Sequence, residues 1–367
     1  MAGLLDGMRV LDVSMWRPMP HATQILCDLG ADVLKVERPG GDPMRSYPEL
    51  FAALARGKRS IELDLKSDAG RARLAELVAE CDVLCESWRP GVAARLGLGA
   101  DALRAARPEL IYCSISGYGQ HGPWRDMPGH DLNYQALAGA IAPRPGDSGP
   151  PPIPRLPAAD LEAGTLAALL VCAAWAKRLT TGEGECIDVA MADVMAWWIG
   201  PRGGVAVDVG EDAGDKDHGD GTRPGGSPGY GVFATADGAF ITLAPLSEPH
   251  LWQAISTALV LGDELAATTF AERIARVGEI NARVAAAIAG MTRDDALERL
   301  RRAGAPVAPV LTPEEASTHE QFVARRTLGH AGGVRSPLLP AWLGVHPRAE
   351  DAPVPAVGAH PEGFGSR

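Results

Sequence analysis

The chain has 367 residues, of which 46% are hydrophobic and 22% are charged, and its formal net charge is −11. This length exceeds one ordinary core, and the composition is typical of a globular protein with two domains. The negative charge disfavours nucleic acid and anionic membranes as partners, so we expect local basic residues to bind any anionic ligand.

Strands and helices alternate through the first half of the chain. A strand over 8–14, a helix over 21–29 and a strand over 31–37 predict a right-handed parallel unit. The alternation continues with strands over 60–65, 82–86, 110–116 and 187–190, and helices over 69–80, 91–96, 100–107, 136–141, 161–175 and from 193. This order predicts an α/β fold with a Rossmann-like parallel sheet, in which ligands bind at the carboxyl ends of the strands.

A second unit begins near residue 228. Asp237-Gly238, between the apolar runs 230–234 and 239–243, is a strong hairpin signal. Helices are expected over 249–259, 270–276, 280–288, 293–303 and 313–317, with a strand over 307–311. We therefore expect a large domain over 1–200, a linker over 201–226, a small α+β domain over 227–320, and a C-terminal segment over 321–367 that returns to the large domain.

Several common ligand signatures are missing from the sequence. The turn after the first strand, over 14–20, has no glycine, which disfavours NAD or FAD there, and no Walker loop occurs. Cys81 and Cys85 lie four apart, but no second Cys/His pair follows at zinc spacing, so we expect no metal site. No signal segment opens the chain and no run reaches ~18 uninterrupted apolar residues, so we expect a cytoplasmic protein that does not span a membrane.

The segment over 129–134, Gly-His-Asp-Leu-Asn-Tyr, is the first candidate site. A histidine moves protons near neutral pH, although a structural role is the simpler interpretation of His130 taken alone. The backbone N–H groups over 130–133 precede an expected helix and are suited to an oxyanion. Asp160, at the start of the helix over 161–175, is the expected partner of His130 and also a candidate N-cap.

Basic residues gather near the expected strand ends. They are Arg38, Arg56, Lys58, Arg59, Lys66 and Arg89. A solvated surface explains any one of them, but as a group at the mouth of a parallel sheet they suit an anionic phosphate.

Long segments of the chain resemble family III CoA-transferases of the CaiB/BaiF type, and most of all the α-methylacyl-CoA racemases. They include DLGADVLKVERPGG (28–41), RGKRSIELDLKS (56–67), ISGYGQHGP (115–123), GHDLNY (129–134), TGEGECIDVAM (181–191) and GAPVAPVLTPEEA (304–316). The resemblance implies two chains interlocked as a homodimer, with each active site between the large domain of one chain and the small domain of the other.

The resemblance also implies a chemistry for the candidate residues. Transferases of this family use one Asp, here Asp160, as a nucleophile that passes through an anhydride and an enzyme–CoA thioester. Racemases keep that Asp and pair it with a His in the motif that this chain has over 129–134. His130 and Asp160 would then exchange the α-proton of a branched acyl-CoA, while the N–H of Asp131 stabilises the enolate oxygen and Glu248 orients the histidine.

The acyl-CoA substrate would be bound by further residues that match the family. The resemblance places Arg38, Leu63, Asp64, Leu65, Lys66 and Arg89 at the CoA nucleotide and phosphates, with Gly129, Leu132, Asn133 and Tyr134 completing the site. It implies a role in fatty acid and lipid metabolism and no cofactor besides the CoA of the substrate.

Two departures from the family pattern keep other activities open. Glu162 stands where racemases have small residues, and could raise the pKa of Asp160 or narrow the pocket. The segment over 16–20 replaces a small, glycine-containing turn. The alternatives to a racemase are therefore a CoA-transferase that uses Asp160 as its nucleophile, and an acyl-CoA-binding protein without catalysis.

Overall fold

The computed structural model describes residues 3–143, 148–200, 227–346 and 349–365. The chain divides into two compact units, each described here by itself. Met1–Ala142, Pro152–Gly200 and Glu320–Arg367 form the first unit, and Pro143–Pro151 and Pro201–His319 form the second. The linker expected over 201–226 lies outside the described residues.

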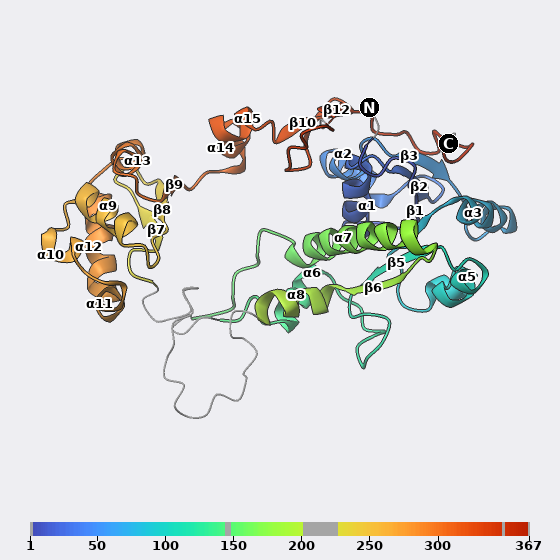
Figure 1. The fold of residues 1–367 in the computed structure, drawn as a ribbon, viewed down its shortest axis with the longest axis horizontal. Coiled ribbons are helices and arrows are strands. Elements are labelled where there is room, and N and C mark those ends of the chain that lie inside the picture. The colour runs from blue at the N-terminus through green and yellow to red at the C-terminus, as the bar shows by residue number, and fades with distance from the viewer. Residues whose placement is uncertain (1–2, 144–147, 201–226, 347–348, 366–367) are drawn as a thin grey trace. The chain divides into compact units, whose positions relative to one another are not determined.

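A six-stranded parallel sheet forms the centre of the first unit, with the order β3-β2-β1-β4-β5-β6 (Figure 1). Its strands are β1 (Arg9–Asp12), β2 (Asp32–Glu37), β3 (Arg59–Glu62), β4 (Val83–Glu86), β5 (Ile111–Ser116) and β6 (Cys186–Ala190). The predicted α/β fold with a Rossmann-like sheet is confirmed. The strand order reverses direction between β1 and β4, and at such a point the loops after the two strands separate and leave room for a ligand.

Helices cover both faces of this sheet. They are α1 (Pro18–Asp28), the 3-10 helix η1 (Pro43–Ser46), α2 (Pro48–Ala55), α3 (Asp68–Glu80), α4 (Val92–Arg95), α5 (Ala100–Ala106), α6 (Asp131–Leu137), α7 (Ala158–Thr181) and α8 (Met191–Ile199). The apolar side chains of α1, α7 and α8 form one core with some residues of the sheet. The apolar side chains of α3 form a second core with other residues of the same sheet. Helices α1, α3, α7 and α8 thus each bury an apolar face against the sheet.

Helix α7 is long and apolar enough, by length and composition alone, to cross a membrane. The core helix of a globular protein passes the same test. In the first unit α7 packs on α1, α8 and β5, and it buries a row of small side chains that includes Ala163, Ala167 and Val171. These contacts account for the small apolar side chains on the buried side of the helix.

Several elements differ from the sequence-based expectation. Helix α1 begins at Pro18, three residues early, because proline at the first helical position lacks an N–H that would be unpaired there. The helix expected over 136–141 is α6, which begins at Asp131 and is followed by Gly139 at φ 81°. Residues 131–134 of the candidate segment therefore form the first turn of a helix, and His130 is its N-cap residue. The helices η1 and α2 were not predicted.

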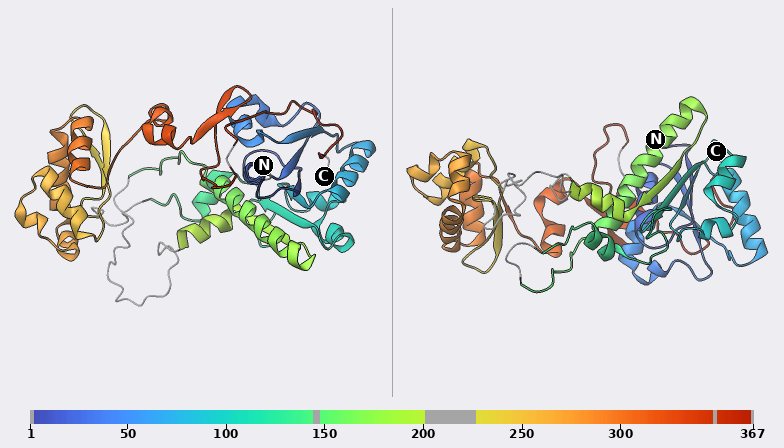
Figure 2. Two further views of the ribbon diagram at one scale, coloured as in Figure 1. Left: turned by 45° about the horizontal axis from the view of Figure 1, so that its top comes forward. Right: turned by 90° about the horizontal axis from the view of Figure 1, so that it is seen from below.

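The second unit contains a three-stranded antiparallel sheet, β7-β8-β9, packed against helices (Figure 2). Its elements are β7 (Gly231–Ala234), β8 (Phe240–Leu243), α9 (Pro249–Leu259), α10 (Asp263–Ala266), α11 (Phe270–Ala275), α12 (Val277–Ala289), α13 (Arg293–Arg302), β9 (Val307–Pro309) and α14 (Pro313–Thr318). The predicted hairpin and the five predicted helices are confirmed. Trp252 and Ile280 are fully buried in its core.

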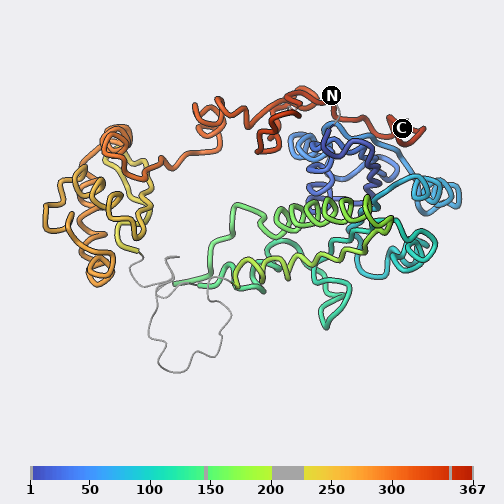
Figure 3. Tube along the Cα trace, in the orientation of Figure 1, coloured from blue at the N-terminus to red at the C-terminus, as the bar shows by residue number. Residues whose placement is uncertain are grey.

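The C-terminal segment packs along the first unit, where the chain can be followed in Figure 3. It comprises α15 (Glu320–Ala324), β10 (Leu328–Ala331), β11 (Val334–Pro337) and β12 (Asp351–Ala352). The N–H of Gly57 donates to the carbonyl of Pro353 at 2.8 Å, and the N–H of His360 donates to the carbonyl of Ser60 at 2.8 Å. These strands were not predicted, because proline and glycine obscure the alternation of short strands.

Candidate active site

A pocket of 780 Å³ opens at the point where the order of the sheet reverses. The loops after β1 and β4 supply Trp16, Arg17 and Arg89 to its lining. His130 and Asp160 also line it. The candidate histidine and the candidate carboxylate, 30 positions apart in the sequence, thus lie on one pocket.

The carboxylate of Asp131 joins the two helices that carry these residues. Its Oδ1 accepts the N–H of Ala159 at 2.8 Å and that of Asp160 at 3.3 Å, and its Oδ2 accepts from Nε2 of Gln135 at 2.6 Å. Asp131 therefore satisfies N–H groups in the first turn of α7, which have no partner within the helix. The expectation that Asp160 caps this helix is wrong, since α7 begins at Ala158 and Asp160 lies inside its first turn.

Burial and, to a smaller extent, the neighbouring negative charge of Asp131 raise the pKa of Asp160 to about 6, while the charges of Arg17 and His130 act against both. A carboxyl group with this pKa exchanges protons readily near neutral pH. Glu162 is not among the groups that raise this pKa. The negative charge that raises the pKa of Asp160 is therefore that of Asp131, which follows His130, and not that of Glu162.

The backbone N–H groups in the first turn of α6 also need hydrogen-bond acceptors, because they have few partners within the helix. The N–H groups of Asn133 and Tyr134 both bond to the carbonyl oxygen of His130. Oδ1 of Asn133 in turn accepts the N–H of His130 at 3.0 Å, which fixes the backbone of the histidine. Among the described residues, no hydrogen bond is found for the N–H of Asp131, so this donor is available to a ligand oxygen.

Tyr134 explains why glycine precedes His130. The tyrosine is 3% exposed and packs edge-on against Tyr118, with 5.1 Å between ring centroids. A Cβ atom on Gly129 would lie 2.8 Å from Cε1 of Tyr134, and one on Gly117 would lie 2.6 Å from its Oη. Burial raises the pKa of Tyr134 to about 12, so its hydroxyl stays protonated at neutral pH.

The pocket brings together only part of the predicted set. It is lined by Arg89, Gly129, His130, Asp131, Tyr134 and Asp160. The side chains of Leu132 and Asn133 are exposed and do not line it. Glu248 belongs to the second unit, where it precedes α9 and its Oε2 accepts the N–H of Leu246 at 3.1 Å.

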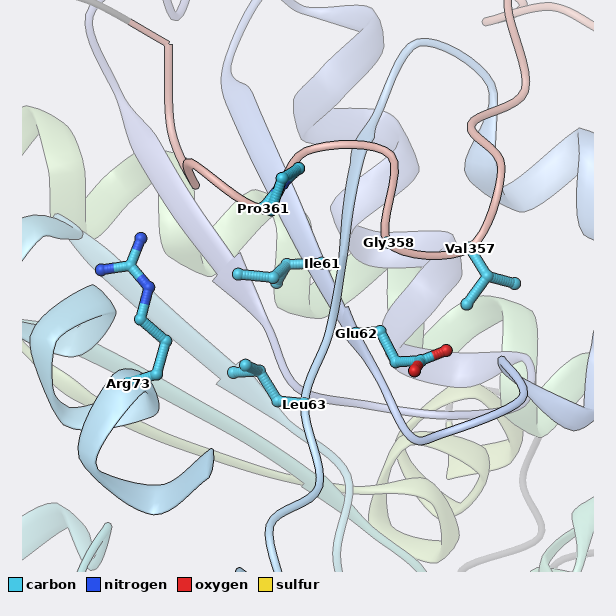
Figure 4. A pocket seen from close by; sticks show the side chains of 7 residues that line it. All are labelled: Ile61, Glu62, Leu63, Arg73, Val357, Gly358 and Pro361. Atoms are coloured by element: carbon cyan, nitrogen blue, oxygen red, sulfur yellow. The ribbon is translucent and has the colours of Figure 1, made fainter. Parts of the chain in front are cut away.

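Apart from Arg89, the residues predicted to bind the CoA nucleotide and phosphates lie outside this pocket. Leu63 lines a separate groove of 510 Å³ with Arg73 and the C-terminal segment; in Figure 4, Ile61 and Leu63 lie between Arg73 and Val357. Lys66 and Asp64 are exposed beside this groove, Leu65 is half-buried, and Arg38 is exposed with its Nε donating to the carbonyl of Gly41. This groove is open and carries both an acidic and a basic side chain.

The prediction of a phosphate site is wrong for three of the six basic residues, namely Arg56, Lys58 and Arg59. Lys58 is 3% exposed and bonds to Asp12, and Arg56 is 5% exposed and bonds to Asp28. Arg59 pairs with Asp32 at 3.1 Å. These cations neutralise carboxylates in and beside the core, where an unpaired charge would be costly, and none of them lines the pocket.

Other lining residues were not predicted. Arg125 and Met191 line the pocket, and so do Trp16 and Arg17, which the sequence marked only as an unusual turn. Position alone could have pointed to Trp16 and Arg17, because the turn after the first strand of such a sheet borders its ligand site. Arg125 and Met191 follow β5 and β6 and have no such signal.

Comparison with known proteins agrees with this architecture. An "Acetyl-CoA:oxalate CoA-transferase" of Acetobacter aceti is 32% identical over 96% of this chain and 92% of the relative. An "Alpha-methylacyl-CoA racemase" of Mus musculus is 34% identical over 97% of this chain and 91% of the relative. The crystal structure of a CaiB/BaiF family protein from Brucella suis has 29% identity and a TM-score of 0.84, covering 99% of this chain and 98% of that one.

A CoA-transferase and a racemase thus both match nearly the whole chain. Their similarity to the chain does not decide between the two activities. Residues 5–361 match the family described as CoA-transferase family III. The chain belongs to CoA-transferase family III.

Proposed function

We propose that the protein is an α-methylacyl-CoA racemase-like isomerase, which inverts the α-carbon of a branched acyl-CoA thioester. The observation that supports this most is the placement of His130 and Asp160 on one pocket, with the pKa of Asp160 raised to about 6. Inversion needs one group to remove the α-proton and a second group to return a proton from the other face. An imidazole and a carboxyl group with a raised pKa suit these two tasks.

In the proposed reaction the ionised group of the pair takes the α-proton and the thioester becomes an enolate. The protonated group of the pair then delivers a proton to the opposite face of the same carbon. The N–H of Asp131, which has no hydrogen-bond acceptor among the described residues, would donate to the enolate oxygen. No redox step or metal ion is needed, and CoA takes part only as the thiol portion of the substrate.

We further propose that the protein acts as an interlocked homodimer, with Glu248 contributed by the partner chain to orient His130. The resemblance to the family supports this part of the proposal.

The test is proton exchange with a single enantiomer of a 2-methylacyl-CoA in D2O. The expected result is α-deuterium incorporation together with inversion, and a loss of about 10³-fold or more in His130→Ala, since general acid–base groups contribute about 10²- to 10⁴-fold. His121→Ala is the matched control, because His121 is exposed and does not line the pocket. It should retain the wild-type rate.

The runner-up activity is a CoA-transferase with Asp160 as nucleophile, supported by the transferases among the relatives. No α-exchange, but transfer of CoA to an added carboxylic acid with His130→Ala little affected, would establish it and contradict the racemase. Tight binding of acyl-CoA with neither reaction would identify an acyl-CoA-binding protein without catalysis.

A further inference from the structure

Gln135 is a buried polar side chain one turn after Asp131 on α6. It is 4% exposed, and its Nε2 donates to Oδ2 of Asp131 at 2.6 Å and to the carbonyl oxygen of Leu156 at 3.3 Å. Tyr134 and Gln135 are the buried residues of this helix, so one of the few inward-facing side chains of α6 is polar. A buried amide costs stability unless hydrogen bonds satisfy it. Its two acceptors here lie at the start of α6 and just before α7.

The two hydrogen bonds of Gln135 connect α6 to the segment that leads into α7. Oδ1 of Asp131 accepts the N–H groups of Ala159 and Asp160. Oδ2 of Asp131 accepts from Gln135, and among the described residues no other donor to Oδ2 is found. The second acceptor of Gln135, the carbonyl oxygen of Leu156, lies two residues before α7 begins. Gln135 thus fixes the orientation of the carboxylate that joins the two helices.

Gln135 does not itself line the active-site pocket, whereas Asp131, His130 and Asp160 do. Any effect of Gln135 on the reaction therefore passes through Asp131. His130 directly precedes Asp131 in the chain, and Asp160 donates its N–H to the carboxylate of Asp131. A rotation of this carboxylate would consequently move one proposed proton-transfer group relative to the other.

Inversion and simple exchange of the α-proton place different demands on this spacing. A single group that removes the proton, exchanges it with solvent and returns it to the same face gives exchange with retention. Inversion also requires a second group aligned with the opposite face of the same carbon. A displacement of about 1 Å can cost about a hundredfold in rate where reacting groups must align. A loosened spacing of His130 and Asp160 should thus reduce inversion more than exchange with retention.

We propose that Gln135 is a positioning residue that determines the stereochemical outcome of the reaction. By fixing the carboxylate of Asp131, it keeps His130 and Asp160 aligned with opposite faces of the α-carbon, so that the proton returns with inversion rather than retention. The inference rests on the proposed racemase activity and adds the residue that couples its two proton-transfer groups.

The test measures inversion and retained exchange separately in Gln135→Met, which keeps the length of the side chain and removes its donors. One enantiomer of a 2-methylacyl-CoA is incubated in D2O, and the deuterium content and the configuration of the α-carbon are both followed at early times. The rate of inversion should fall about tenfold or more, while exchange with retention falls less than about threefold and KM stays within about twofold. The ratio of retained exchange to inversion should therefore rise at least about threefold.

Gln24→Met is the matched control, because the chain makes the same kind of contact away from the pocket. Gln24 is 3% exposed on α1, and its Nε2 donates to Oδ1 of Asp28, four residues later, at 2.9 Å and to the carbonyl oxygen of Arg56 at 3.1 Å. None of these residues lines the pocket. Gln24→Met should lower the midpoint of urea unfolding comparably to Gln135→Met and leave the ratio of retained exchange to inversion unchanged.

An equal loss of inversion and of retained exchange in Gln135→Met would mean that Gln135 only supports the fold, which overturns the inference and leaves the proposed function standing. Gln135→Asn keeps the amide on a side chain one methylene shorter and should raise the ratio by a smaller factor. This variant decides the question if the methionine variant does not fold, and an unchanged ratio in it also overturns the inference. Wild-type protein without α-exchange overturns the inference together with the proposed function.

Discussion

The carboxylate of Asp131 accepts the backbone N–H of Asp160 at 3.3 Å. The residue that follows His130 thus holds the helix that carries Asp160, and its charge also raises the pKa of that residue. One side chain sets both the relative position of the two proposed proton-transfer groups and the pH at which one of them titrates.

Replacing Asp131 with asparagine separates these two effects. An amide oxygen can still accept the N–H groups of Ala159 and Asp160, but the amide nitrogen cannot accept from Nε2 of Gln135, so the free energy of unfolding should fall by about 1 kcal/mol. The lost negative charge should lower the pKa of Asp160. The limb of the pH–rate profile that reports Asp160 should therefore move to lower pH, as measured by α-proton exchange from pH 4 to 9. A limb that stays in place would show that Asp131 does not act on Asp160 through its charge.

Asp160→Asn should stabilise the fold at the expense of activity. The pKa of Asp160 rises from an ordinary 3.8 to about 6 in the folded protein. The folded state therefore holds this proton more tightly than the unfolded state does, and the ionised carboxylate costs stability above pH 6 but not below pH 4. The gain in Asp160→Asn should reach about 1 to 3 kcal/mol at pH 8 and be smaller at pH 5. Urea unfolding at both pH values measures it, and a gain that does not grow with pH would contradict the raised pKa.

Gly129→Ala should damage the site through Tyr134. The new methyl group would lie 2.8 Å from Cε1 of Tyr134 and 3.1 Å from Oη of Tyr118, so the backbone before His130 must shift. We expect a loss of about 1 to 3 kcal/mol in stability and more than about tenfold in exchange rate. Gly278→Ala, in helix α12 with no atom within 4 Å of its new methyl group, is the matched control. It should leave the rate unchanged and be neutral or slightly stabilising.

Lys58→Met should be strongly destabilising, because it removes the cation from a fully buried pair. Asp12 is 0% exposed, and Lys58 helps to hold its pKa at about 2 despite burial. Breaking such a pair leaves one charge unpaired and costs about 3 to 5 kcal/mol. Lys177→Met breaks the exposed pair with Glu185 and should cost less than about 1 kcal/mol. Thermal unfolding of the two variants at pH 7 gives the comparison, and equal losses would be inconsistent with a structural role for Lys58.

Much of the fold was predictable because it depends on local patterns. The strands and helices of the parallel sheet follow from the alternation of apolar runs with helical periods, and the hairpin of the second unit follows from Asp237-Gly238. His130 and Asp160 could be singled out as candidates because both are titratable residues at expected helix starts. The segments with prolines close together, such as η1 and α2 over 43–55, were missed because such residues obscure the period.

The tertiary structure alone decided which charges are free. Lys58, Arg56 and Arg17 look alike in the sequence, but the first two are buried against Asp12 and Asp28 while the third has no partner among the described residues. Contacts of this kind join positions tens of residues apart, and neither spacing nor composition encodes them. The sequence determined which proton-transfer groups the chain carries. Packing of α6 and α1 against α7 decided that they meet on one pocket and which cation faces it.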